Sequence, residues 1–170
     1  TSSTALMELV DDVLDFARIE EGDNTLEVAE FDLHSLIREI ESAFSPRAIA
    51  RDIRMRLFIA NDLPRLVRSD KRSFQKICFN LISNAIKYSK SELLEIRVSY
   101  EAPSSVRFEC TDYGIGIAEE EQSKVFEPFW TAPAVRMGNE QSTGLGLSIT
   151  RELAIALGGT LELSSAVGKG

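Results

Sequence analysis

Apolar side chains recur every three or four residues in four stretches of the chain, and this spacing predicts four helices. The predicted helices run up to Glu21, onward from Asp32, from about Asp70 to Tyr88, and from about Leu145 to Leu157. Ser69 or Asp70 can cap the third helix, and glycines follow the first and the last, where helices commonly stop. Pro46 is expected to interrupt the second helix, whose pattern can resume through Ala50.

Alternating apolar and polar residues predict a β-hairpin formed by residues 93–100 and 106–110. Weaker extended patterns occur in shorter segments: 26–28, 53–59, near Val67, and 160–164. A short acidic helix is expected around 119–125. The sum is an α+β fold, with helices on one face of a largely antiparallel sheet.

The first helix carries an apolar stripe that must be buried against something. The stripe could pack on its own domain, or it could pair with helices that lie outside this chain. The pattern alone leaves both alternatives open. Its members are Leu6, Leu9, Val10, Val13, Leu14 and Ala17.

Composition narrows the classes of function. The 170 residues include 27 acidic and 19 basic side chains, a net charge of −8, which argues against binding nucleic acid through bulk charge. Apolar runs are too short to span a membrane, so we expect no membrane contact. Cys78 and Cys110 lie in apolar patterns and are expected to be buried, reduced thiols. The single histidine excludes a His-rich metal site. Because the chain starts at Thr1, we expect a fragment of a longer protein.

The third helix contains a polar stripe formed by Asn80, Asn84 and Lys87. Asparagine is a poor residue for the middle of a helix, so two of them one turn apart need a reason. Carboxamide oxygens suit Mg²⁺, and a lysine beside them can meet phosphate oxygens. A solvated helix edge would explain the stripe equally well.

Asp112 ends the second strand of the hairpin and begins the string Asp-Tyr-Gly-Ile-Gly-Ile. Its position in the alternation points its side chain toward the buried side, where a carboxylate needs donors such as an exocyclic amine. Gly114 and Gly116 would let the loop pass close to a flat ligand. The alternative is an ordinary Asp-Gly turn.

Residues 143–147, Thr-Gly-Leu-Gly-Leu, open the last helix, where free backbone N–H groups form an anion site. The loop before it, residues 130–142, has the length and position of a lid. A flexible loop that ends in an ordinary helix start is the alternative.

These elements, in this order, resemble the ATP-binding catalytic domain of sensor histidine kinases, within the wider family of gyrase-type and Hsp90-type ATPases. Four stretches look like the named motifs of this family. Residues 80–88 look like the N box and residues 112–117 look like the G1 box. Residues 126–129 look like the F box, and residues 143–147 look like the G2 box. The resemblance implies a two-layer α/β sandwich. It also implies a division into residues 1–21 as the second helix of a dimerisation and phosphoacceptor domain of hybrid type, a linker at 22–30, and the catalytic domain at 31–170.

The resemblance also implies roles for individual residues. Asn84 would bind Mg²⁺, with Asn80 close to the phosphates and the metal. Lys87 would lie near phosphate and Tyr88 near the base, and Asp112 would accept a hydrogen bond from adenine N6. The other implied ATP-binding residues are Thr143, which holds the triphosphate tail with the amides after it, including Leu145, and the pocket-shaping glycines Gly114, Gly116, Gly144 and Gly146.

Three departures from the family pattern affect the expected activity. The phosphoacceptor histidine should precede the first helix, and His34 is instead expected to be a surface helix residue. Ser142 stands where a further glycine is common, and the strand that usually follows Gly170 is missing. We therefore expect that this fragment does not autophosphorylate alone.

The leading hypothesis is a cytoplasmic protein histidine kinase domain that passes the ATP γ-phosphoryl to a histidine outside this chain, for relay to a response-regulator receiver domain. Asn80, the candidate catalytic residue, stands where related ATPases carry a glutamate that activates water. It cannot act as a general base, which disfavours an ATPase clamp. The alternative is a degenerate kinase that regulates a partner kinase. The full protein is expected to be a homodimer, and whether it is anchored in the inner membrane stays open.

Overall fold

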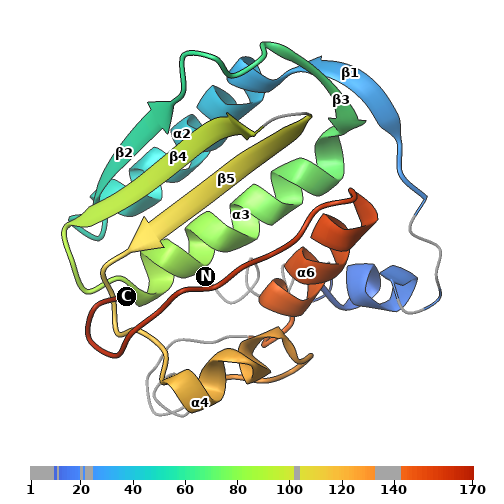
Figure 1. Ribbon diagram of the computed structural model, residues 1–170. Helices are drawn as coiled ribbons and strands as arrows, with labels where there is room; N and C mark the ends of the chain where they lie inside the picture. Colours follow the sequence, from blue (N-terminus) through green and yellow to red (C-terminus); the bar gives the residue numbers. More distant parts are fainter. Residues whose placement is uncertain (1–9, 11, 20, 22–24, 102–103, 133–142) are drawn as a thin grey trace.

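The computed structural model of the chain describes residues 10, 12–19, 21, 25–101, 104–132 and 143–170. Its named elements follow the order predicted from the sequence (Figure 1). They are β1 (Val28–Asp32), α2 (Leu33–Ile49), β2 (Arg54–Ile59), β3 (Leu66–Asp70), α3 (Lys71–Tyr88), β4 (Leu93–Glu101), β5 (Ser105–Asp112), α4 (Glu119–Gln122), the 3-10 turn η1 (Lys124–Phe126) and α6 (Gly146–Ala156).

The described strands form two sheets. One has the order β2-β4-β5, and the other pairs β1 with β3 in antiparallel fashion. The predicted hairpin is confirmed, because β4 and β5 are antiparallel with Ile96 opposite Cys110. The described strand pairings are largely antiparallel, as predicted, and the exception is β2, which runs parallel to β4. A parallel pair needs a long crossover, and α3 lies between these two strands in the sequence.

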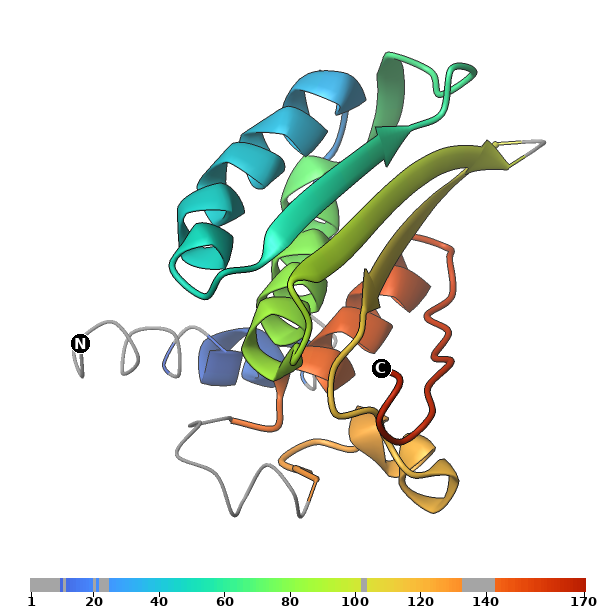
Figure 2. The same cartoon turned by 90° about the vertical axis from the view of Figure 1, so that its left-hand side faces the viewer.

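Helices α2 and α3 cover one face of the three-stranded sheet and make a two-layer α+β sandwich (Figure 2). The main core lies between the layers, and the alternation of β4 places Leu94, Ile96 and Val98 in it. Helix α3 contributes Cys78 and Ile82. The residues that α2 contributes are spaced three or four apart, namely Leu33, Leu36, Ile37, Ile40 and Phe44. The helical and alternating periods read from the sequence therefore identify the buried faces correctly.

Helix α6 packs on a second side of α3 and forms a smaller core with it. Leu145 and Ile149 are fully buried there, next to Ile77 of α3. Helix α3 thus has one face against the sheet and another against α6. The side chains of α3 that lie between those two faces border an open cleft, which also reaches β5 and the start of α6.

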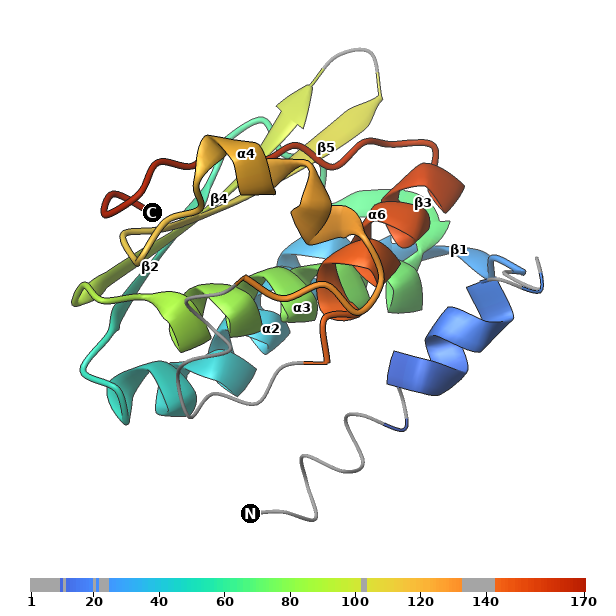
Figure 3. The ribbon, with the colours of Figure 1, turned by 90° about the horizontal axis from the view of Figure 1, so that it is seen from below.

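Two local predictions fail. Pro46 does not interrupt α2, which continues to Ile49. The proline lies in the last turn, where the only amide it removes would have bonded the carbonyl of exposed Ser42, and burial of Ala48 favours completing the helix. Residues 160–164 run alongside β5 without forming a strand (Figures 1 and 3). Leu161 packs inward but Leu163 is exposed, so no continuous apolar face fixes a register.

Strand β1 begins at Val28, inside the stretch predicted as a linker, and it is longer than the extended segment 26–28 that the pattern indicated. It pairs along its whole length with β3. The single histidine, His34, lies in α2, as predicted, but it is half-buried and not fully on the surface. Its Nε2 donates to the Leu63 carbonyl at 3.0 Å and so ties α2 to the turn between β2 and β3.

The first helix is present at residue 10 and residues 12–19, and lies beside the domain rather than within it (Figure 3). The described part of its predicted apolar stripe is not packed on its own domain, because Val10, Val13 and Leu14 are about half exposed. Leu6 and Leu9 lie outside the described residues. Contact with the domain is made by a different face, on which Phe16 and Ile19 pack against the α6 core.

Aspartates cap both long helices. Asp70 accepts from the amides of Arg72 and Ser73 at the start of α3, and its other oxygen accepts from the Glu27 amide at 3.0 Å. Asp32 accepts from the Ser35 amide at the start of α2. Burial raises the pKa of Asp70, but the backbone N–H donors outweigh burial and the pKa lies below its ordinary value.

We expect Asp70→Ala to lower the free energy of unfolding by about 1–2 kcal/mol, because it removes a cap from the helix that joins both cores. The pKa of Asp70 is lower in the folded state than its unfolded value of 3.8. The carboxylate therefore contributes its full stabilisation of the fold above pH 3.8, and this contribution is lost as the pH falls through the folded-state pKa. The difference between the variant and the original chain should therefore shrink between pH 7 and pH 3 in urea titrations.

The matched control is Asp62→Ala, which removes an exposed aspartate from the turn after β2. An equal loss of stability in the two variants, or a difference that does not depend on pH, would contradict the capping role.

Candidate functional site

A cleft of about 2200 Å³ opens between α3, β5, the segment before α6 and the C-terminal segment. Nine of the eleven residues singled out in the sequence line it: Asn80, Asn84, Lys87, Tyr88, Asp112, Gly116, Thr143, Gly144 and Gly146. The other two stand behind its wall. Gly114 is buried, and the Leu145 side chain is fully buried in the α6 core. Motifs far apart in the sequence therefore converge on one site.

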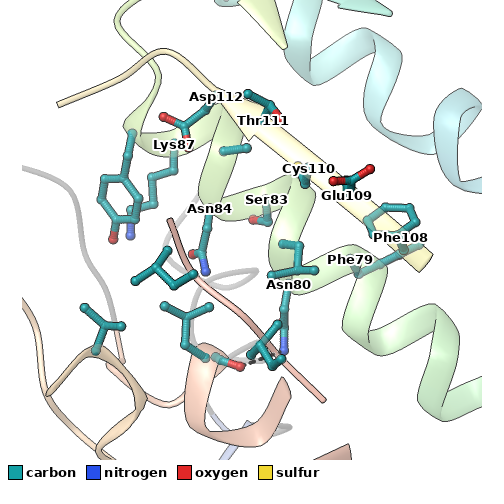
Figure 4. Close-up of a pocket in the computed structure, with 18 of the residues that line it drawn as sticks. Phe79, Asn80, Ser83, Asn84, Lys87, Phe108, Glu109, Cys110, Thr111 and Asp112 are labelled. Carbon is teal, nitrogen blue, oxygen red and sulfur yellow. Dashed lines mark hydrogen bonds between the residues drawn. The ribbon is translucent and has the colours of Figure 1, made fainter. Parts of the chain in front are cut away.

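The polar stripe of α3 faces this cleft. Figure 4 shows Asn80, Asn84 and Lys87 projecting from successive turns of the helix, with Asp112 at the end of β5. The Asn84 carboxamide makes no hydrogen bond with any described residue, although it is half-buried. A polar helix edge that only contacts solvent would be exposed, whereas these side chains are half-buried. The stripe is therefore better explained as a lining of the cleft than as a solvated helix edge.

Asn80 has a structural contact that the sequence did not indicate. Its Nδ2 donates to the Gly146 carbonyl and to Thr150 Oγ1, both at 3.2 Å. These two acceptors fix the amide so that its nitrogen faces α6 and its oxygen is left for the cleft. Asn80 therefore links α3 to the first turn of α6 while it presents a hard oxygen ligand.

Lys87 lies on the last turn of α3, with its Nζ 5.3 Å from the centre of the Tyr88 ring. This is the distance of a cation–π contact, which places a positive charge and an aromatic face side by side at one end of the cleft. The two side chains offer an anion contact and a stacking surface from a single helical turn.

The Asp112 loop is tightly constrained by its glycines. Asp112 Oδ1 accepts from the Gly114 amide at 2.8 Å. A Cβ added to Gly114 would lie 2.2 Å from the Tyr88 carbonyl oxygen, and one added to Gly116, at φ +66°, would lie 2.0 Å from the Ala166 carbonyl oxygen. Both glycines are thus required by close backbone approaches. The second carboxylate oxygen of Asp112 is left as an acceptor at the cleft.

The segment before α6 also depends on a glycine. Gly144 has φ +70°, and a Cβ there would lie 2.6 Å from the Phe129 carbonyl carbon. Gly146 has space around it, so its role is not set by crowding. Leu145 N donates to Thr143 Oγ1 at 3.1 Å, and the free amides of the first turn of α6 form a partly positive site for an anion.

The first helix reaches this anion site. The Thr143 hydroxyl donates to Asp12 Oδ2 at 3.2 Å, and Asp12 and Asp15 both form ion pairs with Lys76 of α3. Phe16 packs edge-to-face on Phe129 at 5.7 Å between ring centres. The pattern of the first helix offered no signal for this contact, because Asp12 and Asp15 lie outside its apolar stripe.

Of the predicted lid, residues 130–132 are described and border the cleft, while residues 133–142, including Ser142, lie outside the described residues. Both cysteines are free thiols, as predicted, but only Cys78 is fully buried, whereas Cys110 is half-buried at the cleft. Burial raises the pKa of Cys78 well above its usual value, and burial together with the charge of Asp112 raises the pKa of Cys110 to about 12. These shifts keep both thiols protonated at neutral pH.

Within the described part of the chain, no group of three or more His, Cys, Asp or Glu side chains could hold a metal alone. The cleft instead offers amide oxygens and a helix N-terminus toward α6, and a lysine together with a carboxylate between glycine loops toward the end of α3. Mg²⁺ is commonly held by a few protein oxygens together with substrate phosphates and water, and this donor set fits that mode. The arrangement suits a ligand with a donor-bearing flat ring and a phosphate tail. No helix among the described residues has the length and apolarity needed to cross a membrane.

Comparison with known proteins agrees with this geometry. Residues 69–170 match the family described as histidine kinase-, DNA gyrase B- and HSP90-like ATPases. The chain is 33% identical over 173 residues to the signal transduction histidine-protein kinase BarA of Escherichia coli, covering 99% of this chain and 19% of BarA. It is also 33% identical over 170 residues to the hybrid signal transduction protein dokA of Dictyostelium discoideum, covering 96% of this chain and 10% of dokA.

Solved structures show the same fold. Full-length ShkA in complex with AMPPNP superimposes with a TM-score of 0.86 at 29% identity, over 99% of this chain and 34% of ShkA. Histidine kinase ThkA in complex with the response regulator protein TrrA gives a TM-score of 0.69 at 25% identity, over 93% of this chain and 42% of that one. The chain thus spans a tenth to a fifth of the two curated relatives, and belongs to the family of histidine kinase-, DNA gyrase B- and HSP90-like ATPases as a catalytic ATP-binding domain of the kind carried by hybrid sensor histidine kinases.

Proposed function

We propose that this domain binds Mg-ATP in the cleft and donates the γ-phosphoryl to a histidine outside the chain. The observation that carries the proposal is the convergence of the α3 stripe, Asp112 and the start of α6 on one cleft. Each motif has an ordinary structural explanation by itself. Together they provide a base acceptor, phosphate donors and metal-type oxygens in a single site.

In this proposal each residue has one task. Asp112 accepts from adenine N6, and Tyr88 lies beside the base. Lys87, Thr143 and the Leu145 amide hold the phosphates, while Gly116, Gly144 and Gly146 let the backbone approach them. Asn84, with Asn80 next to it, would hold Mg²⁺, which neutralises phosphate charge when bound. Gly114 acts indirectly, by letting the Asp112 loop close against α3.

The reaction needs no general base in this chain. The acceptor imidazole nitrogen attacks the γ-phosphorus, the bond to the β–γ bridging oxygen breaks, and ADP leaves with the electron pair. Catalysis then comes from positioning and charge neutralisation. Asn80 cannot deprotonate water, so transfer is favoured over hydrolysis.

The partners follow from this chemistry. The acceptor histidine would lie in a segment or partner subunit outside the chain, and the phosphoryl would pass to a receiver domain, as the ThkA–TrrA complex suggests by analogy. The exposed Val10, Val13 and Leu14 would pair with other helices in a cytoplasmic homodimer. We propose that residues 1–21 are the helix of the dimerisation domain and that a linker leads from it to the catalytic domain. The linker predicted at 22–30 is shorter by its last three residues, because β1 begins at Val28 and pairs with β3 of the domain.

The direct test is calorimetric titration of the 170-residue chain with Mg-AMPPNP. We expect saturable binding, and we expect Asp112→Asn to weaken it about 10- to 100-fold, because an NH₂ group would face the adenine amine while Asn Oδ1 could still accept from Gly114. The matched control is Glu109→Gln, which removes a carboxylate from the same strand and the same cleft. Absence of binding at millimolar nucleotide would refute the proposal.

Asn84→Ala tests the metal role. The original chain should bind AMPPNP more tightly in the presence of Mg²⁺ than in the presence of EDTA. In the variant, the affinity for AMPPNP with Mg²⁺ should fall about 10-fold, while the affinity for AMPPNP in EDTA should stay unchanged. Ser83→Ala, one residue earlier and exposed, is the control. An equal loss with and without Mg²⁺ would assign Asn84 to the nucleotide instead of the metal.

Asp12→Ala tests whether the first helix competes with phosphate for Thr143. The variant frees the Thr143 hydroxyl and removes a negative charge, so we expect nucleotide binding to tighten about 2- to 10-fold. Asp15→Ala, which breaks an ion pair with the same Lys76 without touching Thr143, should leave the affinity unchanged. Equal effects from the two variants would point to general docking of the helix.

A further inference from the structure

Arg51 lies outside all of the motifs, in the turn that connects α2 to β2. Backbone hydrogen bonds hold this turn: Arg51 N donates to the Ala48 carbonyl and Asp52 N to the Ile49 carbonyl, each at 3.0 Å. Asp52 takes the left-handed conformation at φ 57°. The turn is anchored on both sides by buried residues, Ala48 and Ile53. The base of the Arg51 side chain is thus fixed to the main core.

The guanidinium of Arg51 reaches the last turn of α3. Its Nη1 donates to the Lys87 carbonyl at 3.1 Å and to the Ile86 carbonyl at 3.4 Å. The final carbonyls of a helix have no amide partner within the helix, and they carry partial negative charge. The helix ends at Tyr88 because Ser89 is extended. Arg51 therefore supplies a hydrogen-bond donor and a positive charge to carbonyl groups that have no amide partner within the helix.

That last turn is coupled to the base end of the cleft. It carries Lys87 and Tyr88, and the Tyr88 carbonyl oxygen fills the space where a Cβ of Gly114 would lie, at 2.2 Å. Gly114 in turn donates to Asp112 Oδ1. A shift of the α3 end would therefore move the loop that orients the Asp112 carboxylate.

We infer that Arg51 is a positioning residue that sets the preference of this site for adenine over guanine. The inference rests on the proposed nucleotide function and deepens it. Adenine presents an amine where guanine presents a carbonyl oxygen, so a well-placed carboxylate accepts from the first base and repels the second. Arg51 acts through the last turn of α3, which it holds. Lys87 lies on that turn, but the other proposed phosphate contacts, Thr143 and the Leu145 amide, lie before α6 and do not depend on it. Loosening the turn therefore reduces the base discrimination more than it reduces contacts to the phosphates.

The experiment compares Kd values for Mg-ATP and Mg-GTP in the 170-residue chain. Arg51→Gln should weaken ATP binding about 5- to 10-fold and change GTP binding less than about twofold, so the ATP/GTP ratio falls. Both bonds of Arg51 come from Nη1 alone, so Arg51→Lys keeps a cation whose single ammonium nitrogen can donate to both carbonyls, and should keep the ratio within about twofold of the original. Arg54→Gln removes the same charge from an exposed position three residues further along, and should leave both Kd values unchanged.

The outcomes separate the two proposals. If the original chain binds neither nucleotide, the proposed function fails and this inference fails with it. If the original chain binds ATP but Arg51→Gln leaves the ratio unchanged, or weakens both nucleotides equally, only the Arg51 inference is overturned. Should Arg51→Gln not fold, Gly114→Ala displaces the same loop from its other side, and an unchanged ratio in that variant would equally overturn the inference.

Discussion

The packing of α3 against two layers is the constraint on which the rest of the structure depends. One face of this helix, through Cys78 and Ile82, completes the core with the sheet, and another, through Ile77, completes the core with α6. A helix held on two sides has little freedom to shift. The stripe between those faces is therefore presented to the cleft in a fixed orientation, and preorganised donors contribute more to binding than mobile ones.

The same constraint explains why the motifs could be found from sequence. A rigid helix with a polar stripe off its apolar face leaves a periodic trace, and Asn80 and Asn84 stand out because propensity disfavours them in mid-helix. Alternation in the hairpin likewise fixed which face Asp112 would occupy. Features set by local spacing and propensity were predictable, among them the stripe of Asn80, Asn84 and Lys87 and the position of Asp112, all of which line the cleft. Tyr88, which also lines it, was assigned through the family resemblance alone.

What could not be predicted depends on contacts between distant segments. The parallel pairing of β2 with β4 follows from where a crossover ends, which no local pattern encodes. Residues 160–164 have strand-like alternation, yet an exposed Leu163 and the lack of a paired register leave them irregular. The bond between Thr143 and Asp12 joins residues 131 positions apart, and Asp12 has the sequence signature of a solvated side chain.

Asn80 has both a structural contact and a proposed chemical role. Its NH₂ group is occupied by Gly146 and Thr150, so the amide has one orientation and its oxygen is the atom left for the cleft. A glutamate at this position would have no N–H groups for those acceptors, and could not make the same link between α3 and α6. In the proposed function, the side chain that offers no general base is therefore also the one that joins α3, which carries the candidate Mg²⁺ ligands, to α6, whose first amides would hold phosphate. The absence of a general base at this position and the link between the two helices are consequences of one side chain.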